Sequence, residues 1–134
     1  EFLQALITEK KAEIIIESSL PQIFGDKRRI IEVLQNLIEN ALKFSNPGTD
    51  IRIEIGFSPE KNAFFVKDNG IGVNPKYHKK IFGLFDKLES KSEGTGIGLA
   101  IVSRIIEVHK GKIWVESEGN GKGSYFYFTI NFSG

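Results

Sequence analysis

The sequence predicts an α+β fold: a two-layer α/β sandwich with about three helices on one face of a mixed, mainly antiparallel sheet of about five strands. Three observations lead to this prediction. Two long segments carry apolar residues at helical spacing along one face. Several short segments alternate apolar and polar residues, which is typical of half-buried strands. Their order is strand, helix, strand, strand, short helix, helix, strand, strand, which suits such a sandwich.

The first long helix follows a short strand. Residues 1–12 are mixed in character and are expected to end an upstream helix or linker, so the domain itself is placed at 13–134. Three consecutive isoleucines indicate a strand at 13–18. Asp26 is a suitable N-cap for a helix that extends to Phe44, after which a Pro-Gly pair ends it.

Two predicted hairpins supply the remaining strands. Alternation of isoleucine with charged residues indicates that 51–57 pairs with 63–67. Glycines flanked by strands indicate a second hairpin, in which 112–118 pairs with 124–132. In the last strand the Phe side chains are expected to face one way and the Tyr side chains the other. A short helix is expected at 75–80, between the two hairpins.

The composition excludes several classes of protein. The 134 residues fit one domain, and a hydrophobic content of 40% with 11 Phe can build a core. The 18 Lys and Arg nearly balance the 17 Asp and Glu, so no nucleic-acid partner is expected. Without cysteine there is neither a disulfide nor a thiolate metal site. No stretch resembles a membrane span or a signal peptide, so we expect a cytoplasmic domain. Its parent protein could still be anchored in a membrane.

A glycine-rich stretch stands immediately before the second long helix, predicted at Ile97–Lys110. Within Ser92–Ala100, glycines occupy the alternate positions Gly94, Gly96 and Gly98. Glycine lets a ligand approach bare backbone N–H groups, and a helix N-terminus adds unpaired donors and a positive dipole end. Together these features predict a phosphate site. The stretch fits neither a Walker loop nor a dinucleotide loop, and the alternative is a flexible linker.

The first long helix carries three polar residues on one side, here called the polar stripe. Its members, Asn36, Asn40 and Lys43, lie within about 60° of one another on the helical wheel. Amide oxygens suit a Mg²⁺ ion that keeps most of its water, and a lysine supplies a positive charge for phosphate. The alternative is an ordinary solvated helix face.

The turn Asp68-Asn69-Gly70-Ile71-Gly72 follows a predicted strand. A carboxylate at the end of a strand can accept a hydrogen bond from an exocyclic amine, such as that of adenine. The glycines would let a flat ring approach the backbone. Taken alone, these residues are more typical of a plain turn.

Four motifs in this order resemble those of sensor histidine kinases. Asn36–Ser45 resembles their N box, Asp68–Gly72 their G1 box, Phe82–Phe85 their F box and Gly94–Leu99 their G2 box. The segment Lys76–His78 is similar to that of phytochrome-like kinases. Each motif is common by itself, whereas the ordered set is specific. The resemblance implies the Bergerat ATP-binding fold that these kinases share with DNA gyrase, Hsp90 and MutL.

The resemblance also implies a role for each site residue. Asp68 would read the adenine amino group. Asn40 would ligate the Mg²⁺ that bridges the phosphates of ATP, with Asn36 in support, and Lys43 and Lys87 would hold phosphate. The other residues that it assigns to the nucleotide site lie in the G1 box, the F box, the glycine-rich stretch and the last strand: Gly70, Ile71, Gly72, Phe82, Phe85, Gly94, Thr95, Gly96, Ile97, Gly98, Leu99 and Thr129.

The implied function is transfer of the γ-phosphoryl group of ATP to a histidine on a separate dimerisation domain, for relay to the receiver domain of a response regulator. The related ATPases place a glutamate where this chain has Asn36, and an amide cannot take a proton from water. This disfavours hydrolysis and favours transfer to imidazole, which is a nucleophile when neutral. Glu39 could act as a base or orient the acceptor, so the expected catalytic residues are Asn36, Glu39, Lys43 and Lys87.

The two histidines, His78 and His109, are expected to be structural, so the chain should bind ATP without phosphorylating itself. We expect the chain to be a monomer and its parent protein to be a homodimer. Two alternatives stay open at this point. One is an ATP-sensing pseudokinase or interaction module, and the other is a Bergerat-fold ATPase switch.

Overall fold

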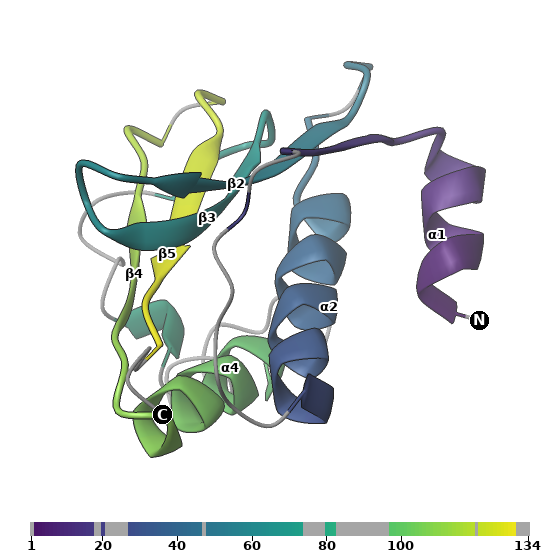
Figure 1. Cartoon of the computed structure of the whole chain (residues 1–134). Helices are drawn as coiled ribbons and strands as arrows, with labels where there is room; N and C mark the ends of the chain where they lie inside the picture. Colours follow the sequence, from purple (N-terminus) through teal and green to yellow (C-terminus); the bar gives the residue numbers. More distant parts are fainter. Residues whose placement is uncertain are drawn as a thin grey trace.

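In the computed structural model of the chain, one five-stranded mixed sheet forms the upper layer (Figure 1). The structure describes residues 2–17, 20, 27–46, 48–73, 80–82, 97–119 and 121–130. The strands are β1 (Glu13–Ile16), β2 (Arg52–Ser58), β3 (Ala63–Asp68), β4 (Ile113–Glu116) and β5 (Ser124–Phe128). Their order in the sheet is β1-β2-β3-β5-β4; β1 and β2 are parallel, and all other neighbours are antiparallel.

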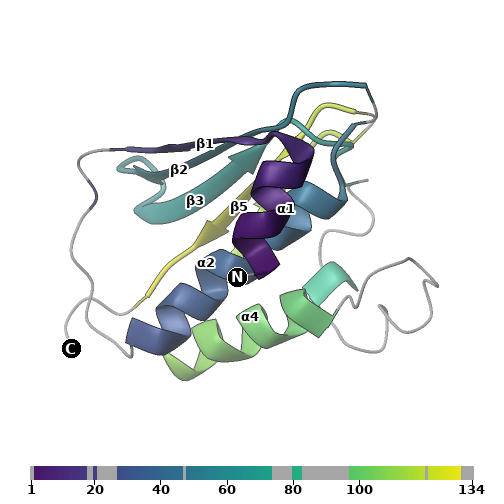
Figure 2. The same cartoon turned by 90° about the vertical axis from the view of Figure 1, so that its right-hand side faces the viewer.

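The helices lie on one side of this sheet and confirm the predicted α+β sandwich. They are α1 (Phe2–Lys10), α2 (Lys27–Lys43), α4 (Ile97–Val108) and the short 3-10 helix η2 (Lys80–Phe82). Figure 2 shows α2 and α4 beneath the sheet, with α1 against α2. In the part of the chain that the structure describes, none of the helices has the length and apolarity that a membrane span requires.

The core fills the space between the sheet and α2 and α4. Its residues alternate along the strands and recur at helical spacing along the helices, as the sequence predicts. The largest fully buried side chains are Phe126, Phe128, Leu37, Leu42, Ile53, Ile106, Val33, Val66 and Val102. Two residues from the predicted apolar helix faces are instead exposed: Ile31 at 43% and Val108 at 66%. Ile31 lies near the start of α2, and Val108 is the last residue of α4.

On the opposite face of the sheet, none of the described helices is present, and aromatic side chains cover the face instead. Tyr127 stacks on Trp114 at 5.4 Å between ring centroids and on Tyr125 at 5.6 Å. Lys61 and Lys67 lie over the Tyr127 and Tyr125 rings, each with Nζ 5.3 Å from the ring centroid. This confirms the predicted division of the last strand, with Phe on the helix side and Tyr on the other.

Several element ends differ from the sequence prediction. The second long helix was expected to reach Lys110 but ends at Val108, because Lys110 turns left-handed with φ 58° and the N–H of Gly111 donates back to the carbonyl of Ile106 at 2.9 Å. The last strand ends at Phe128 rather than at residue 132. The short helix predicted at 75–80 lies, up to residue 79, outside the described residues.

Phe126 is among the largest fully buried side chains, so its truncation should be costly. Truncation of Phe126 to Ala should lower the free energy of unfolding by about 3–5 kcal/mol, because it creates a cavity between the sheet and the helices. The matched truncation Val108→Ala, at an exposed site, should change it by about 0.5 kcal/mol or less. Urea unfolding followed by circular dichroism measures both values. A similar loss for the two variants would show that the core is not where the structure places it.

Candidate functional site

Asp68 is the last residue of β3, and its carboxylate is buried, with 7% of the residue exposed. It accepts two hydrogen bonds, from the N–H of Gly70 to Oδ1 at 2.8 Å and from the hydroxyl of Ser124 to Oδ2 at 2.9 Å. Ser124 is available because it pairs with Asp68 in the β3–β5 register. Burial raises the pKa of Asp68 above its ordinary value, and these hydrogen bonds oppose that rise. A carboxylate held in this way is a fixed acceptor for a ligand amine.

The turn that follows Asp68 has room for glycine and little else. A Cβ on Gly70 would collide with the carbonyl oxygen of Phe44, which accepts a hydrogen bond from the N–H of Ile71 at 2.9 Å. Gly72 has φ 79°, in the left-handed region that glycine adopts readily. The side chain of Ile71 is 41% exposed beside the buried carboxylate. The turn therefore presents an exposed apolar side chain next to a buried polar acceptor, which suits a flat heterocycle.

The polar stripe lies along α2, and two of its members are already bound to neighbours on the same helix. The amide of Asn36 donates from Nδ2 to the carbonyl of Glu32 at 2.8 Å. Lys43 pairs with Glu39, with 3.2 Å between Nζ and Oε1, and both side chains are about one-third exposed, at 31% and 30%. Asn40 is half-buried between them. The Asn36 amide is thereby oriented, and the charges of Lys43 and Glu39 are held together at a partly open surface.

The start of α4 approaches the polar stripe closely at Gly98. A Cβ on Gly98 would lie 2.8 Å from Oδ1 of Asn36, which is too close for any residue but glycine unless Asn36 moves. Leu99, the next residue, points into the core and is 4% exposed. Gly98 therefore makes room for the side chain of Asn36. The sequence predicts that it makes room for a ligand, and that role stays a prediction. The first turn of α4 and the stripe are brought together.

Three groups thus meet along α2. The turn after Asp68 contacts the end of the helix at Phe44, the polar stripe follows the helix, and Gly98 adjoins the stripe at Asn36. Among the described residues there is no group of three or more His, Cys, Asp or Glu that could hold a metal ion. Amide oxygens with one nearby carboxylate instead fit a Mg²⁺ ion held mainly by phosphate and water oxygens.

Not all of the predicted site residues join this group. Phe82 is half-buried in η2 and packs edge-on against Phe126, with 6.2 Å between ring centroids, so it contributes to the core. Phe85, Lys87, Gly94, Thr95 and Gly96 lie outside the described residues, as does the side chain of Ile97.

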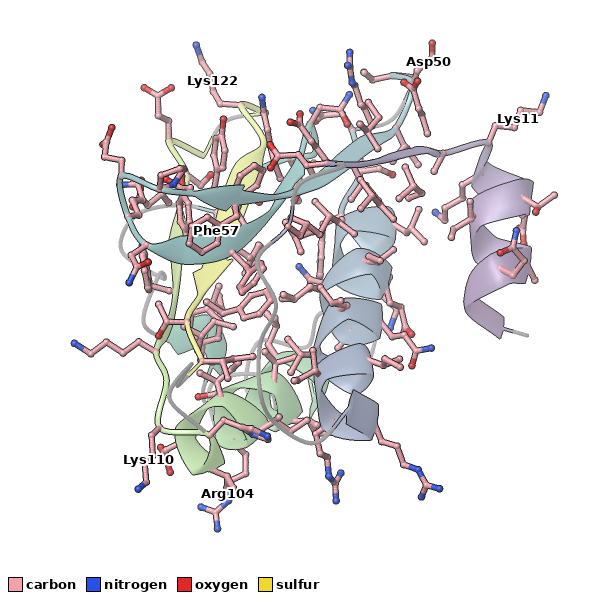
Figure 3. The ribbon with its side chains drawn as sticks, in the orientation of Figure 1. Lys11, Asp50, Phe57, Arg104, Lys110 and Lys122 are labelled. Carbon is pink, nitrogen blue, oxygen red and sulfur yellow. The ribbon has the colours of Figure 1, made fainter. Side chains whose placement is uncertain are left out.

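The structure does not bring Thr129 to the site. Its hydroxyl accepts a hydrogen bond from the N–H of Lys112 at 2.9 Å, beyond the end of β5 that lies far from Asp68. Five residues of extended chain separate it from Ser124, which corresponds to about 16 Å. Figure 3 labels Lys110, close in sequence to Lys112, at the opposite end of the molecule from Asp50. The hydroxyl that contacts Asp68 belongs to Ser124.

Sequence reasoning missed two residues of the site, Ser124 and Asn46. A signal for Ser124 was available, because it shares the strand face of Phe126 and Phe128, just as Asp68 shares the face of Val66. Thr129 is an odd-numbered residue and falls on the face of the tyrosines. Nothing local identifies Asn46, since its side chain bonds to residues 23, 24 and 75 positions away.

Comparison with known proteins gives a consistent result. The family model described as "Histidine kinase-, DNA gyrase B-, and HSP90-like ATPase" matches residues 25–134. The methanogenesis regulatory histidine kinase FilI of Methanothrix harundinacea is 45% identical over 120 residues, covering 88% of this chain and 13% of FilI. The phytochrome-like protein Cph1 of Synechocystis is 42% identical over 132 residues, covering 96% of this chain and 17% of Cph1.

A solved structure shows the same fold. Full-length ShkA in complex with AMPPNP superposes with a TM-score of 0.76 at 32% sequence identity, and the match covers 98% of this chain and 28% of ShkA. This chain therefore spans less than one-third of the length of ShkA, and less than one-fifth of the lengths of FilI and Cph1.

Proposed function

The chain belongs to the family of histidine kinase-, DNA gyrase B- and HSP90-like ATPases, as a catalytic ATP-binding domain of the histidine kinase kind, and we propose that it transfers the γ-phosphoryl group of Mg-ATP to a histidine on a separate dimerisation domain. The observation that carries the proposal is the buried Asp68 carboxylate, held at the end of β3 beside the Gly70–Gly72 turn. Its place next to α2 would set adenine at one end of that helix and the phosphates along the polar stripe.

Adenine recognition would use the Asp68 carboxylate as the acceptor for the exocyclic amine. The carboxylate already has two protein donors, yet each carboxylate oxygen has two lone-pair sites, so it can accept from a ligand as well. Ile71, which is 41% exposed, would pack on the ring. The glycines on both sides of it make room for neighbouring segments of the protein, since the backbone of Phe44 and that of Gly119 lie where a Cβ would stand. The capture of ShkA with AMPPNP, an analogue of ATP, supports a nucleotide as the ligand of this fold.

Asn40 would ligate Mg²⁺ through its amide oxygen, with Asn36 in support, and Lys43 and Lys87 would hold phosphate. Bound Mg²⁺ supplies charge neutralisation for the phosphates. The pairing of Lys43 with Glu39 gives Lys43 a carboxylate to exchange for phosphate oxygens. It also holds the Glu39 carboxylate beside the stripe, where it could accept a proton from the acceptor imidazole or orient that ring.

In the transfer step the bond between the γ-phosphorus and the bridging oxygen breaks, and ADP leaves with its electron pair. The lone pair of a neutral imidazole nitrogen forms the new bond to phosphorus. Positioning and charge neutralisation supply most of the catalysis in such a step. Asn36 stands where an ATPase would need a base for water, and its Nδ2 is occupied by the carbonyl of Glu32. The chain is therefore proposed to hydrolyse ATP slowly.

The acceptor histidine, the homodimer that carries it and the receiver domain of a response regulator belong to the proposal for the parent protein. A cytoplasmic position of the domain belongs to it as well. His109 is half-buried immediately after α4, and its Nδ1 lies 2.9 Å from the carbonyl of Ile105, which supports a structural role. His78 lies outside the described residues, so the absence of self-phosphorylation stays a prediction.

Calorimetric titration with ATP, followed by a steady-state hydrolysis assay, tests the proposal. The chain should bind one ATP in the presence of Mg²⁺ and should release phosphate at a rate close to background. Absence of ATP binding would contradict the nucleotide site. Sustained hydrolysis that Asn36→Ala leaves unchanged would favour the ATPase switch.

A further inference from the structure

The side chain of Asn46 bonds to three carbonyl oxygens around the candidate site. Its Nδ2 donates to the carbonyls of Asn69 at 3.1 Å, Gly70 at 2.9 Å and Gly121 at 3.3 Å. Only the NH₂ group of the amide can face three acceptors at once, so the orientation of the side chain is fixed. Asn46 follows α2 by three residues, Asn69 and Gly70 follow β3, and Gly121 belongs to the turn between β4 and β5. One amide therefore joins three separate segments.

One of these bonds continues directly to Asp68. The carbonyl of Asn69 and the N–H of Gly70 belong to the same peptide unit. Asn46 donates to that carbonyl, and the same peptide donates its N–H to Oδ1 of Asp68 at 2.8 Å. Hydrogen bonds on both sides of a peptide polarise it in the same direction and strengthen one another. Asn46 thereby fixes the plane of the peptide that holds the Asp68 carboxylate.

The surrounding contacts fix the rest of the turn but not this peptide plane. The N–H groups of Gly121 and Gly123 donate to the carbonyls of Ile71 at 2.8 Å and Gly70 at 2.9 Å. The side chain of Asn69 donates to the carbonyl of Asp50 at 2.7 Å, and its Oδ1 accepts from a backbone N–H of β2. Figure 3 shows Asp50 and Lys122 at the same end of the molecule, where these segments meet. In the described part of the chain, Asn46 is the one side chain that donates to the carbonyl of this peptide.

We propose that Asn46 is a positioning residue for adenine recognition, which acts through the 69–70 peptide on the Asp68 carboxylate. This inference rests on the proposed function, in which Asp68 reads the exocyclic amine. Without the Asn46 amide, the peptide between Asn69 and Gly70 loses the side-chain hydrogen bond to its carbonyl, and its N–H is then held by Asp68 alone. The peptide plane would be less firmly fixed, and with it the direction of the carboxylate. The contribution comes from the NH₂ donor and not from the bulk of the side chain.

The test compares the affinities of the full 134-residue chain for ATP and ITP, measured by calorimetry. ITP has the same phosphates but carries an oxo group in place of the amine. Asn46→Asp preserves size and removes the donor, and Asn46→Ala removes the donor without adding charge. Repulsion between a new carboxylate and the phosphates would weaken both nucleotides equally, so the ratio of the two dissociation constants isolates the amine. We expect the preference of the wild-type chain for ATP to fall by about tenfold in both variants.

The control is Asn62→Asp, the same chemical change in the turn between β2 and β3, which should leave the preference for ATP intact. If Asn46→Asp does not fold, the Asn46→Ala ratio decides the question. A lower melting temperature with an unchanged ATP preference would overturn the proposal, because it would show a structural role only. A wild-type chain that binds ATP and ITP equally would overturn the role of Asp68 first, and that of Asn46 with it.

Discussion

Replacement of Asp68 by Asn is expected to weaken ATP binding by about 100-fold. The hydrogen bond from the adenine amine to a charged acceptor is lost, and the NH₂ group of the new amide, itself a donor, faces the amine unfavourably. The change should not destabilise the chain at neutral pH. Asn can still accept from the N–H of Gly70 through its oxygen, and its NH₂ can donate to the Ser124 hydroxyl. A residue whose removal costs binding but not stability is retained for function.

The pH dependence of stability provides a second readout for the same variant. Burial raises the pKa of Asp68, so the folded chain keeps a proton at pH values where the unfolded chain has lost it. The stabilisation from this group is complete below the ordinary aspartate pKa and is lost as the pH rises through the raised pKa. The free energy of unfolding should therefore fall over that window in the wild-type chain, and this part of the fall should be absent in Asp68→Asn. Urea unfolding at a series of pH values from 3 upward, in steps of about half a unit, measures it.

The matched control for Asp68→Asn is Asp50→Asn, the same substitution at an exposed residue (Figure 3). Asp50 contributes its backbone carbonyl to Asn69, which the substitution leaves in place. We expect the ATP affinity of this variant to match that of the wild-type chain. Equal ATP affinity in Asp68→Asn and Asp50→Asn would refute the adenine role of Asp68.

Replacement of Asn40 by Ala is expected to abolish the dependence of ATP binding on Mg²⁺ and to lower phosphoryl transfer by at least about 100-fold, because charge neutralisation at the phosphates supplies most of the catalysis. Titrations with ATP in the presence of Mg²⁺ and of EDTA measure the first effect. The control is Gln35→Ala, which removes an amide from the exposed side of the same helix. Asn40→Asp is a poorer test, since a carboxylate can also ligate Mg²⁺. Binding by Asn40→Ala that still depends fully on Mg²⁺ would count against the metal role.

The elements with strong periodicity were predictable, and the contacts between elements were not. The apolar face of α2 and the alternation in β5 follow from side-chain direction alone, so the sequence indicates both. The ends of α4 and β5 depend on contacts that no local pattern shows, such as the bond from Gly111 back to Ile106 and the close approach of Gly111 to the Thr129 backbone.

The same distinction applies to the site. Asp68, the Gly70–Gly72 turn and the polar stripe carry motif signals, so the sequence marks them as candidates, and their roles stay predictions. The contact of Ser124 with Asp68 depends on the register of β3 against β5, whereas Thr129 was implied by the family resemblance and bonds to Lys112. Asn46 acts through bonds to residues distant in sequence, and Gly98 fits against Asn36 through helix packing. Neither relation can be read from spacing along one chain.

We propose above that this chain transfers phosphate to a histidine on another domain. The most direct measurement mixes the chain with the separately produced dimerisation domain of its parent protein and γ-labelled ATP, and follows acid-labile phosphate on each component. We expect label on a histidine of the dimerisation domain, no label on this chain, and no transfer by Asn40→Ala. ATP binding without any phosphohistidine would contradict the claim and favour an ATP-sensing module.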